Sequence, residues 1–384
     1  MNSVSNPLLT QLEKHLPFLD AIRGVAIFVV FLFHCLVAAF PYDQLIWNGF
    51  FRNFNAPNSF LFVYPITYGW AGVAIFFTVS GFCIHLSYCA RKNWSNFFVK
   101  RFFRIYPLYL ISILFFFFVW PWGSFSISSG DKIEEILSHI SLYQNFSYKY
   151  IYGISPSFWS IAVEVQLYLI YPILYFLISK NGIVNALKVS FIAEFTITAF
   201  ESYYDCVYET KLPCLIVHSA FAYWFSWSIG VYLADSFLNR KINVFSRIRF
   251  DIIALLAFLC PLFRPTAPFA FLMFSILTCV AIDRFISKQW VVPDFGNMKY
   301  LWNHLSSLGV ISYSFYLIHQ PFMFLIEKIL RRVPFDYMTN DLIVFFIYSL
   351  SYPIIFYFST RSYKYLEKNF IKLGANLNIL LKNI

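Results

Sequence analysis

Long apolar runs separated by short polar connections cover most of the 384-residue chain. A helix needs roughly 20 apolar residues to cross a bilayer core that is about 30 Å thick. The runs predict an all-α, polytopic membrane protein with ten transmembrane helices. We place these helices at residues 19–40, 66–88, 105–122, 157–179, 183–201, 215–237, 250–264, 267–286, 305–328 and 341–359.

Lys and Arg residues are concentrated in alternate connections between these runs, a pattern that sets the orientation of a membrane protein. A cytoplasmic N-terminus places most of the basic loop residues inside, and the opposite orientation reverses that bias. We therefore expect both termini to be cytoplasmic. The chain 1–384 then forms a single transmembrane domain, with an N-terminal cytoplasmic segment at 1–15 and a C-terminal cytoplasmic tail at 361–384.

The composition supports a membrane protein and argues against a soluble globular protein or a nucleic-acid-binding protein. Hydrophobic residues make up 59% of the chain and charged residues only 12%, which is too apolar for a soluble globule. The net charge of +10 is carried by short basic clusters between apolar runs, so we expect the lipid bilayer as a partner and no nucleic acid. Without a soluble second domain or a repeat of fixed period, the chemistry is expected within the membrane or at its edges.

Three ionisable residues lie within the first predicted helix. Asp20, Arg23 and His34 fall on one helical face together with Ile27, because each residue turns an α-helix by 100°. Ionisable groups on a spanning helix are costly unless they face a protein interior or a watery cavity, so this face is a candidate site. The alternative is that Asp20 and Arg23 cap and anchor the helix while His34 only packs.

Helical rise places two further polar residues at a similar depth to His34. In a core about 30 Å thick, His34 and His319 lie roughly 20 Å from the inner face, and Glu164 lies roughly 10 Å from the outer face. This agreement predicts one shared polar chamber in the outer half of the membrane. Neighbouring residues share helical faces with Glu164 and His319, namely Ser160, Tyr168, Ser312 and Tyr316. The two tyrosines could instead be interface anchors or packing residues.

A basic cluster stands at the cytoplasmic end of the third predicted helix. Arg101 and Arg104 are three residues apart on one helical face, with Lys100 beside them. Two guanidinium groups in this arrangement can bind a polyanion through forked hydrogen bonds. The alternative is anchoring by the positive-inside rule.

Five segments of the chain are similar to the signature segments of the acyltransferase-3 family, a family of integral membrane acyltransferases that includes O-acetyltransferases. They occur in the family's order and cover nearly the whole chain, with residues 180–300 matching least. The segments are LDAIRGVAIFVVFLFH (19–34), FFTVSGFCI (76–84), FFVKRFFRIYPLY (97–109), SFWSIAVEVQLYLIYP (157–172) and SYSFYLIHQPF (312–322).

This resemblance implies ten spans, a cytoplasmic acetyl-CoA or related acyl-CoA donor, and transfer to a hydroxyl, usually of a surface or exported carbohydrate. Where the family often has paired acids, this chain has Glu164 followed by Val165. The family's first-helix Arg and His correspond to Arg23 and His34, its paired arginines to Arg101 and Arg104, and its WS…E…Y segment to Trp159, Glu164 and Tyr168.

Acyl transfer to a hydroxyl needs a base for the hydroxyl proton, donors for the developing oxyanion and a grip on the coenzyme phosphates. His34 is the expected general base or transient acyl carrier, and Glu164 and His319 are expected to orient it or bind the acceptor. The donor is expected at Arg23, Lys100, Arg101 and Arg104, and the acceptor at Trp159, Ser160, Tyr168 and Tyr316. We expect no metal, and a bacterial cytoplasmic (inner) membrane as the location.

A multi-span transporter or flippase of a glycan or related metabolite is the alternative from another functional class. Intramembrane His, Glu and Arg residues also mark translocation pathways. Such proteins often contain inverted repeats and interrupted helices in matching halves, and neither is clear in this sequence.

Overall fold

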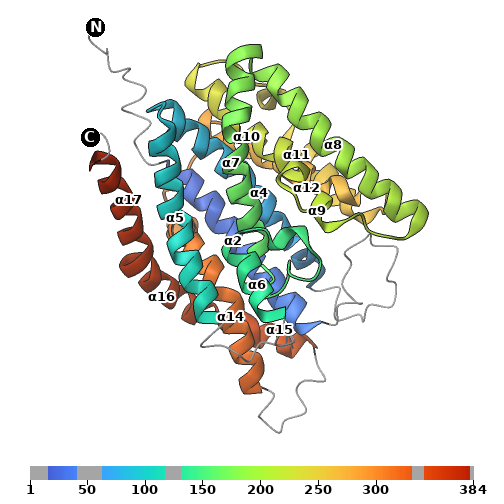
Figure 1. Cartoon of the computed structure of the whole chain (residues 1–384), viewed down its shortest axis with the longest axis vertical. Helices are drawn as coiled ribbons and strands as arrows, with labels where there is room; N and C mark the ends of the chain where they lie inside the picture. Colours follow the sequence, from blue (N-terminus) through green and yellow to red (C-terminus); the bar gives the residue numbers. More distant parts are fainter. Residues whose placement is uncertain (1–15, 41–62, 117–130, 331–340, 381–384) are drawn as a thin grey trace.

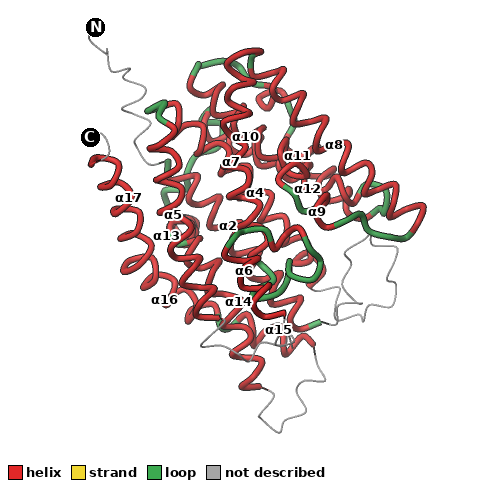
Figure 2. Tube along the Cα trace, viewed as in Figure 1, coloured by secondary structure: helices red, strands yellow, loops and turns green. Residues whose placement is uncertain are grey.

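The computed structural model describes residues 16–40, 63–116, 131–330 and 341–380. Within these ranges the chain forms helices and connecting turns and contains no strand (Figure 2), which confirms the all-α prediction. The N-terminal half contains α2 (Pro17–Ala39), η3 (Tyr64–Trp70), α4 (Ala71–Cys89), α5 (Trp94–Leu114), α6 (Asp131–Ile140), η5 (Gln144–Phe146), α7 (Phe158–Asn181) and α8 (Ile183–Tyr208).

The C-terminal half begins with short elements and ends in a long, interrupted helix. Its elements are α9 (Cys214–Val217), η6 (Ala220–Tyr223), α10 (Trp224–Leu238), η7 (Val244–Arg247), α11 (Phe250–Leu259), η8 (Cys260–Leu262), η9 (Ala267–Phe269), α12 (Ala270–Ile286), α13 (Gly296–Val310), α14 (Ser312–Leu330), α15 (Asp341–Ser349), α16 (Tyr352–Ser362), the π-helix η11 (Tyr363–Glu367) and α17 (Lys368–Leu380).

Six helical segments among the described residues are long and apolar enough to cross a membrane, or seven if the bent pair α13 and α14 counts as one span. This finding fits an integral membrane protein. Each of the ten predicted runs overlaps at least one helix, with residues 117–122 of the third run outside the described residues. However, α5 carries several charges, and α10 and α11 are short. The predicted number of ten spans is therefore not confirmed.

The predicted span at 305–328 is broken and not continuous. The chain bends by 84° between α13 and α14, and α14 starts afresh at Ser312. The end of α13 is pressed against α2, because a Cβ added to Gly309 would lie 1.8 Å from the carbonyl oxygen of Asp20. Gly24 of α2 approaches the backbone of Leu305 equally closely. These two glycines allow the helices to cross at backbone contact.

The predicted run at 341–359 is also interrupted, at residues 350–351, before Pro353 in the first turn of α16. Beyond it, residues 361–380 of the predicted tail continue as helix and pack along α5, with Gly374 against the ring of Phe103. Figure 1 shows α2 passing through the middle of the bundle, with α8 at one edge and α16 and α17 at the opposite edge. The predicted N-terminal segment at 1–15 and residues 381–384 of the predicted tail lie outside the described residues. The side of the membrane on which either end of the chain lies stays a prediction.

Candidate functional site

Two histidines from α2 and α14 meet in the middle of the bundle. His34 Nδ1 lies 2.8 Å from His319 Nε2. One turn earlier, the rings of Phe31 and Phe315 pack edge to face at 5.7 Å, so the two helices run side by side here. His319 is fully buried and His34 is partly buried. The restart of α14 at Ser312, rather than a straight span, brings His319 to His34.

The hydrogen bonds of this pair define its tautomers. His319 Nδ1 lies 2.8 Å from the carbonyl oxygen of Tyr316, and a carbonyl can only accept, so Nδ1 carries the proton. In a neutral ring His319 Nε2 is then an acceptor, and His34 Nδ1 must donate to it. The lone pair of His34 therefore lies on Nε2, which bonds to no described residue. This atom is available as a base.

A polar cavity of about 60 Å³ lies next to the histidine pair, between α2, α4, α5, α7 and α14. It contains two arginines from different helices, a carboxylate and several hydroxyls. These polar lining residues are Arg23, Ser80, Arg104, Ser160, Glu164, Tyr168, Ser312, Tyr313 and Tyr316. We call this space the central cavity.

Tyrosine hydroxyls shape the wall of the central cavity. Tyr168 donates to Glu164 Oε1 at 2.5 Å and lies 3.1 Å from the hydroxyl of Ser80. Tyr316 donates to the carbonyl oxygen of Ser157 at 2.7 Å and lies 2.6 Å from the hydroxyl of Ser160. The second carboxylate oxygen of Glu164 makes no hydrogen bond to a described residue, which leaves it available to a ligand.

The predicted single chamber is divided in the structure. Glu164 lines the central cavity, whereas His34 and His319 do not. Tyr316 lies between them, since it lines the cavity and its ring centroid is 5.5 Å from that of His319. A movement of the Tyr316 ring would open the cavity toward the histidine pair.

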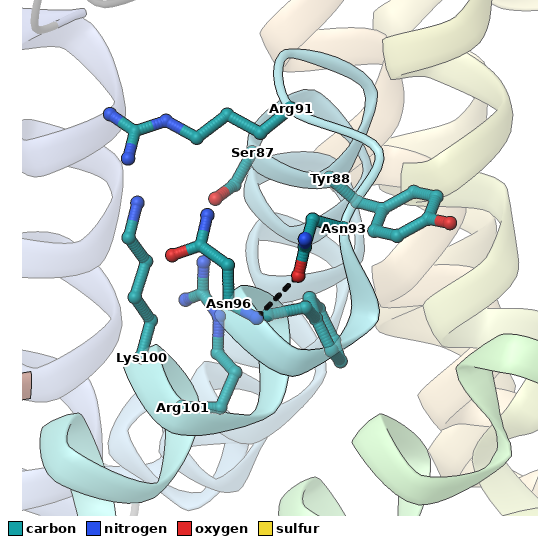
Figure 3. A pocket seen from close by; sticks show the side chains of 8 residues that line it. Ser87, Tyr88, Arg91, Asn93, Asn96, Lys100 and Arg101 are labelled. Atoms are coloured by element: carbon teal, nitrogen blue, oxygen red, sulfur yellow. Dashed lines mark hydrogen bonds between the residues drawn. The ribbon is translucent and has the colours of Figure 1, made fainter. Parts of the chain in front are cut away.

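A second, smaller cavity of about 10 Å³ lies at the start of α5, and Figure 3 shows the cationic side chains of Arg91, Lys100 and Arg101 along it. Asn93 accepts a hydrogen bond from the backbone N–H of Asn96 at 2.8 Å and so caps α5. The Nε of Arg101 and the Oδ1 of Asn96 are buried without a hydrogen-bond partner. Buried polar atoms are normally paired, so these two atoms are open to a water or a ligand. We call this space the rim cavity; its lining is completed by Ser87, Tyr88 and Phe97.

The structure separates the two arginines that were predicted to bind a polyanion together. Arg101 lines the rim cavity and Arg104 lines the central cavity, and the two cavities share no lining residue. Residues three apart on an α-helix differ by about 60° in direction and about 4.5 Å in height, which is enough to separate them. In the rim cavity, the second arginine beside Arg101 is Arg91. Arg91 belongs to the basic cluster after α4, and only the fold shows that it lines the same cavity as Arg101.

Trp159, a predicted acceptor-binding residue, lies outside the lining of the central cavity. The centroid of its ring lies 5.5 Å from that of His218 and 5.8 Å from that of Tyr223.

Glu367 was not predicted from the sequence. It is buried and accepts a hydrogen bond from Ser314 at 2.7 Å. Glu367 belongs to the predicted cytoplasmic tail, so its position in the sequence offers no reason to expect it in the protein interior. The only feature of the sequence that points to it is that it is a lone acid among lysines.

The chain is similar to two named proteins over part of its length. The acyltransferase MdmB of Streptomyces mycarofaciens is 26% identical over 168 residues, covering 43% of this chain and 40% of the relative. Nodulation protein 10 of Rhizobium leguminosarum bv. viciae is 27% identical over 148 residues, covering 33% of this chain and 38% of the relative. The chain thus spans about two fifths of the length of each relative. No solved structure matches the chain.

The sequence model of the acyltransferase domain matches residues 16–360, which include both cavities and the histidine pair. The chain therefore belongs to the acyltransferase-3 family of integral membrane proteins.

Proposed function

We propose that the protein is a transmembrane O-acyltransferase. It moves an acetyl or other small acyl group from cytoplasmic acyl-CoA to a hydroxyl of a carbohydrate or cell-envelope glycan, in the bacterial cytoplasmic membrane. The observation that carries this proposal is the histidine pair, which leaves a basic His34 Nε2 beside a polar cavity. The family match and the relative named as an acyltransferase support the same reaction class.

The rim cavity carries groups that suit the phosphates of the donor, and it must widen to admit them, since its volume of about 10 Å³ holds no more than about one water. Arg91, Lys100 and Arg101 supply positive charge from two elements, and the unpaired Nε of Arg101 is a donor for a phosphate oxygen. The rest of the donor would extend into the central cavity, where Arg23 and Arg104 offer further donors. Because the cavities are separate, the side chains between them must move when the donor enters.

The proposed reaction begins when His34 Nε2 removes the proton of the acceptor hydroxyl as its oxygen attacks the thioester carbonyl. N–H donors of the central cavity stabilise the resulting oxyanion. The carbon–sulfur bond then breaks, and the leaving thiolate takes the proton back from His34, so that an ester and free CoA are formed. His319 keeps His34 Nδ1 protonated throughout. The free oxygen of Glu164 would hold the acceptor hydroxyl before attack. His34 as a transient acyl carrier is the second route.

The test uses membranes that contain the wild-type protein or His34→Ala, supplied with labelled acetyl-CoA and a glycan acceptor. We expect transfer by the wild-type protein and its loss in the variant. His304→Ala is the matched control, since His304 is exposed and bonds to Tyr352. Unchanged transfer in His34→Ala at normal expression refutes the central role of His34.

The transporter alternative predicts a different result. Mass spectrometry of surface glycans from cells with and without the gene distinguishes the two functions. A gain of one acyl unit supports transfer, and export of an unmodified glycan without consumption of acyl-CoA supports transport.

A further inference from the structure

A buried carboxylate from the C-terminal part of the chain lies beside the central cavity. Glu367 is only 3% exposed and accepts a hydrogen bond from the hydroxyl of Ser314 at 2.7 Å. Ser314 belongs to α14, five residues before His319. A buried carboxylate is costly unless cations and hydrogen bonds compensate it, so its surroundings indicate its role.

The local backbone explains how this side chain reaches the interior. Residues Tyr363–Glu367 form the π-helix η11, between α16 and α17. A π-turn carries one residue more than an α-turn, which changes the direction of the side chains, and such turns occur often at functional sites. The helix that follows is held to α5 by the contact of Gly374 with Phe103. Glu367 is thus fixed against the helix that carries Arg104.

The compensating charges come from the central cavity. Among the described residues, Arg104 and Arg23 are close enough for their charges to stabilise the carboxylate of Glu367. Neither guanidinium forms an ion pair or a hydrogen bond with any residue in the described part of the chain. The carboxylate therefore balances their charge from a distance, while their N–H groups stay available to a ligand in the cavity.

We propose that Glu367 is a positioning residue for Arg104 and Arg23, so that the C-terminal helix is part of the acyl-donor site. This inference rests on the proposed function. Without the negative charge, two guanidinium groups in one small cavity would repel each other and turn away from the reacting end of the donor. The donor phosphates, which bind at the rim cavity, would still be held.

The chain offers a closely matched control. Glu194 of α8 is also 3% exposed, and it accepts bonds from the backbone N–H of Ser226 at 2.8 Å and from its hydroxyl at 2.5 Å. It lines neither cavity. Glu194→Gln therefore removes a buried charge of the same kind without touching the donor site.

The experiment compares purified wild-type protein with Glu367→Gln, Glu367→Asp, Ser314→Ala and Glu194→Gln in one lipid environment. The kcat and the KM for acetyl-CoA are measured per folded molecule at saturating acceptor, together with thermal unfolding. Gln at 367 keeps an acceptor for Ser314 but loses the charge. Ala at 314 keeps the charge and the hydrogen bond from the backbone of residue 314, but it removes the hydroxyl bond, so the carboxylate is held less firmly.

We expect Glu367→Gln to lower kcat roughly tenfold or more, with the donor KM changed less than about threefold, because orientation and not phosphate binding is lost. Ser314→Ala should lower kcat less, and Glu367→Asp should retain part of the activity. Glu194→Gln should leave both constants unchanged.

Two results overturn the inference while leaving the proposed function intact: equal kinetics of Glu367→Gln and Glu194→Gln, or a loss only in the amount of folded protein. If Glu367→Gln fails to fold, Ser314→Ala with wild-type kcat overturns it as well. A wild-type protein that transfers no acyl group contradicts the proposed function itself, and the inference with it.

Discussion

The imidazole of His319 is oriented by backbone carbonyls, and that orientation determines which nitrogen of His34 is basic. Many catalytic histidines are oriented by a carboxylate, which also stabilises the imidazolium. Here the orienting group is a second imidazole whose Nδ1 is anchored to Tyr316. A neutral orienting group provides direction without charge, so the proposed role of His319 is to hold a tautomer of His34.

This role predicts a graded response at position 319. His319→Ala leaves His34 Nδ1 without an acceptor, and we expect kcat to fall roughly a hundredfold, as for other lost orienting groups. His319→Gln offers an amide oxygen and should retain more activity than Ala, with the donor KM unchanged in both variants. Steady-state transfer of labelled acetyl groups at saturating donor measures the difference. Wild-type turnover in His319→Ala contradicts the tautomer argument.

The rim cavity predicts an effect on donor binding instead of turnover. Arg101→Ala removes a charged hydrogen-bond donor whose loss is worth about 1.5–3 kcal/mol, so the KM for acetyl-CoA should rise roughly tenfold to a hundredfold. The value of kcat at saturating donor should change much less. Arg249→Ala is the control, because Arg249 is exposed and paired with Asp251. A fall in kcat at unchanged KM would place Arg101 at the reacting end of the donor.

At the scale of elements, hydropathy predicts the existence of the helices but not their interruptions. The described parts of the apolar runs are mainly helical, because only a helix satisfies its own backbone hydrogen bonds in lipid. Hydropathy does not predict the bend at Ile311, because the bend accompanies a tertiary contact, that of Gly309 with the backbone of α2. The helical tail was missed because its lysines resemble a topology signal. Helical depth groups His34 with His319 but assumes an unbroken helix from residue 305, so only the fold explains their contact. The division of Arg101 and Arg104 could not be anticipated, since it depends on how α5 is rotated in the bundle.

The short helix α6, in the connection between α5 and α7, provides a test at this scale. The hydroxyl of Tyr109 donates to the carbonyl of His139 at 3.2 Å, and Tyr106 donates to Ile140 at 3.1 Å, so α6 is tied to α5. Burial lowers the pKa of His139 from 6.5 to about 4, although its hydrogen bond to the Glu135 carbonyl opposes the shift. The folded segment therefore holds His139 neutral.

This pKa difference predicts that α6 loosens in acid. Between pH 6.5 and about 4 the unfolded segment binds more protons than the folded one, so the free energy of local unfolding falls as the pH falls through that window. Above pH 6.5 the contribution is fully present. Hydrogen exchange of the α6 amides, corrected for the intrinsic rate at each pH, measures it. His139→Gln should flatten the dependence, and an unchanged slope in that variant would assign it to another group.

At the scale of the whole molecule, the two cavities and the histidine pair follow one another along the bundle. On α2, Arg23 precedes His34 by eleven residues, a rise of about 16 Å. Arg91, Lys100 and Arg101 gather at the end of the bundle that basic loop residues mark as cytoplasmic. A donor held at the rim and an acceptor held near His34 would thus enter from opposite sides of the membrane.

This arrangement predicts that the reaction depends on the side from which each substrate is supplied. Sealed inside-out vesicles expose the rim cavity, so they should transfer label from added acetyl-CoA to an acceptor enclosed in their lumen. Sealed right-side-out vesicles should remain inactive with external acetyl-CoA, because a charged nucleotide does not cross the bilayer. Detergent should make the two preparations equal, which controls for the amount of enzyme. Equal activity before detergent would mean that the donor does not bind at the cytoplasmic end. The orientation derived from the basic loops would then be reversed, or both substrates would enter from one side.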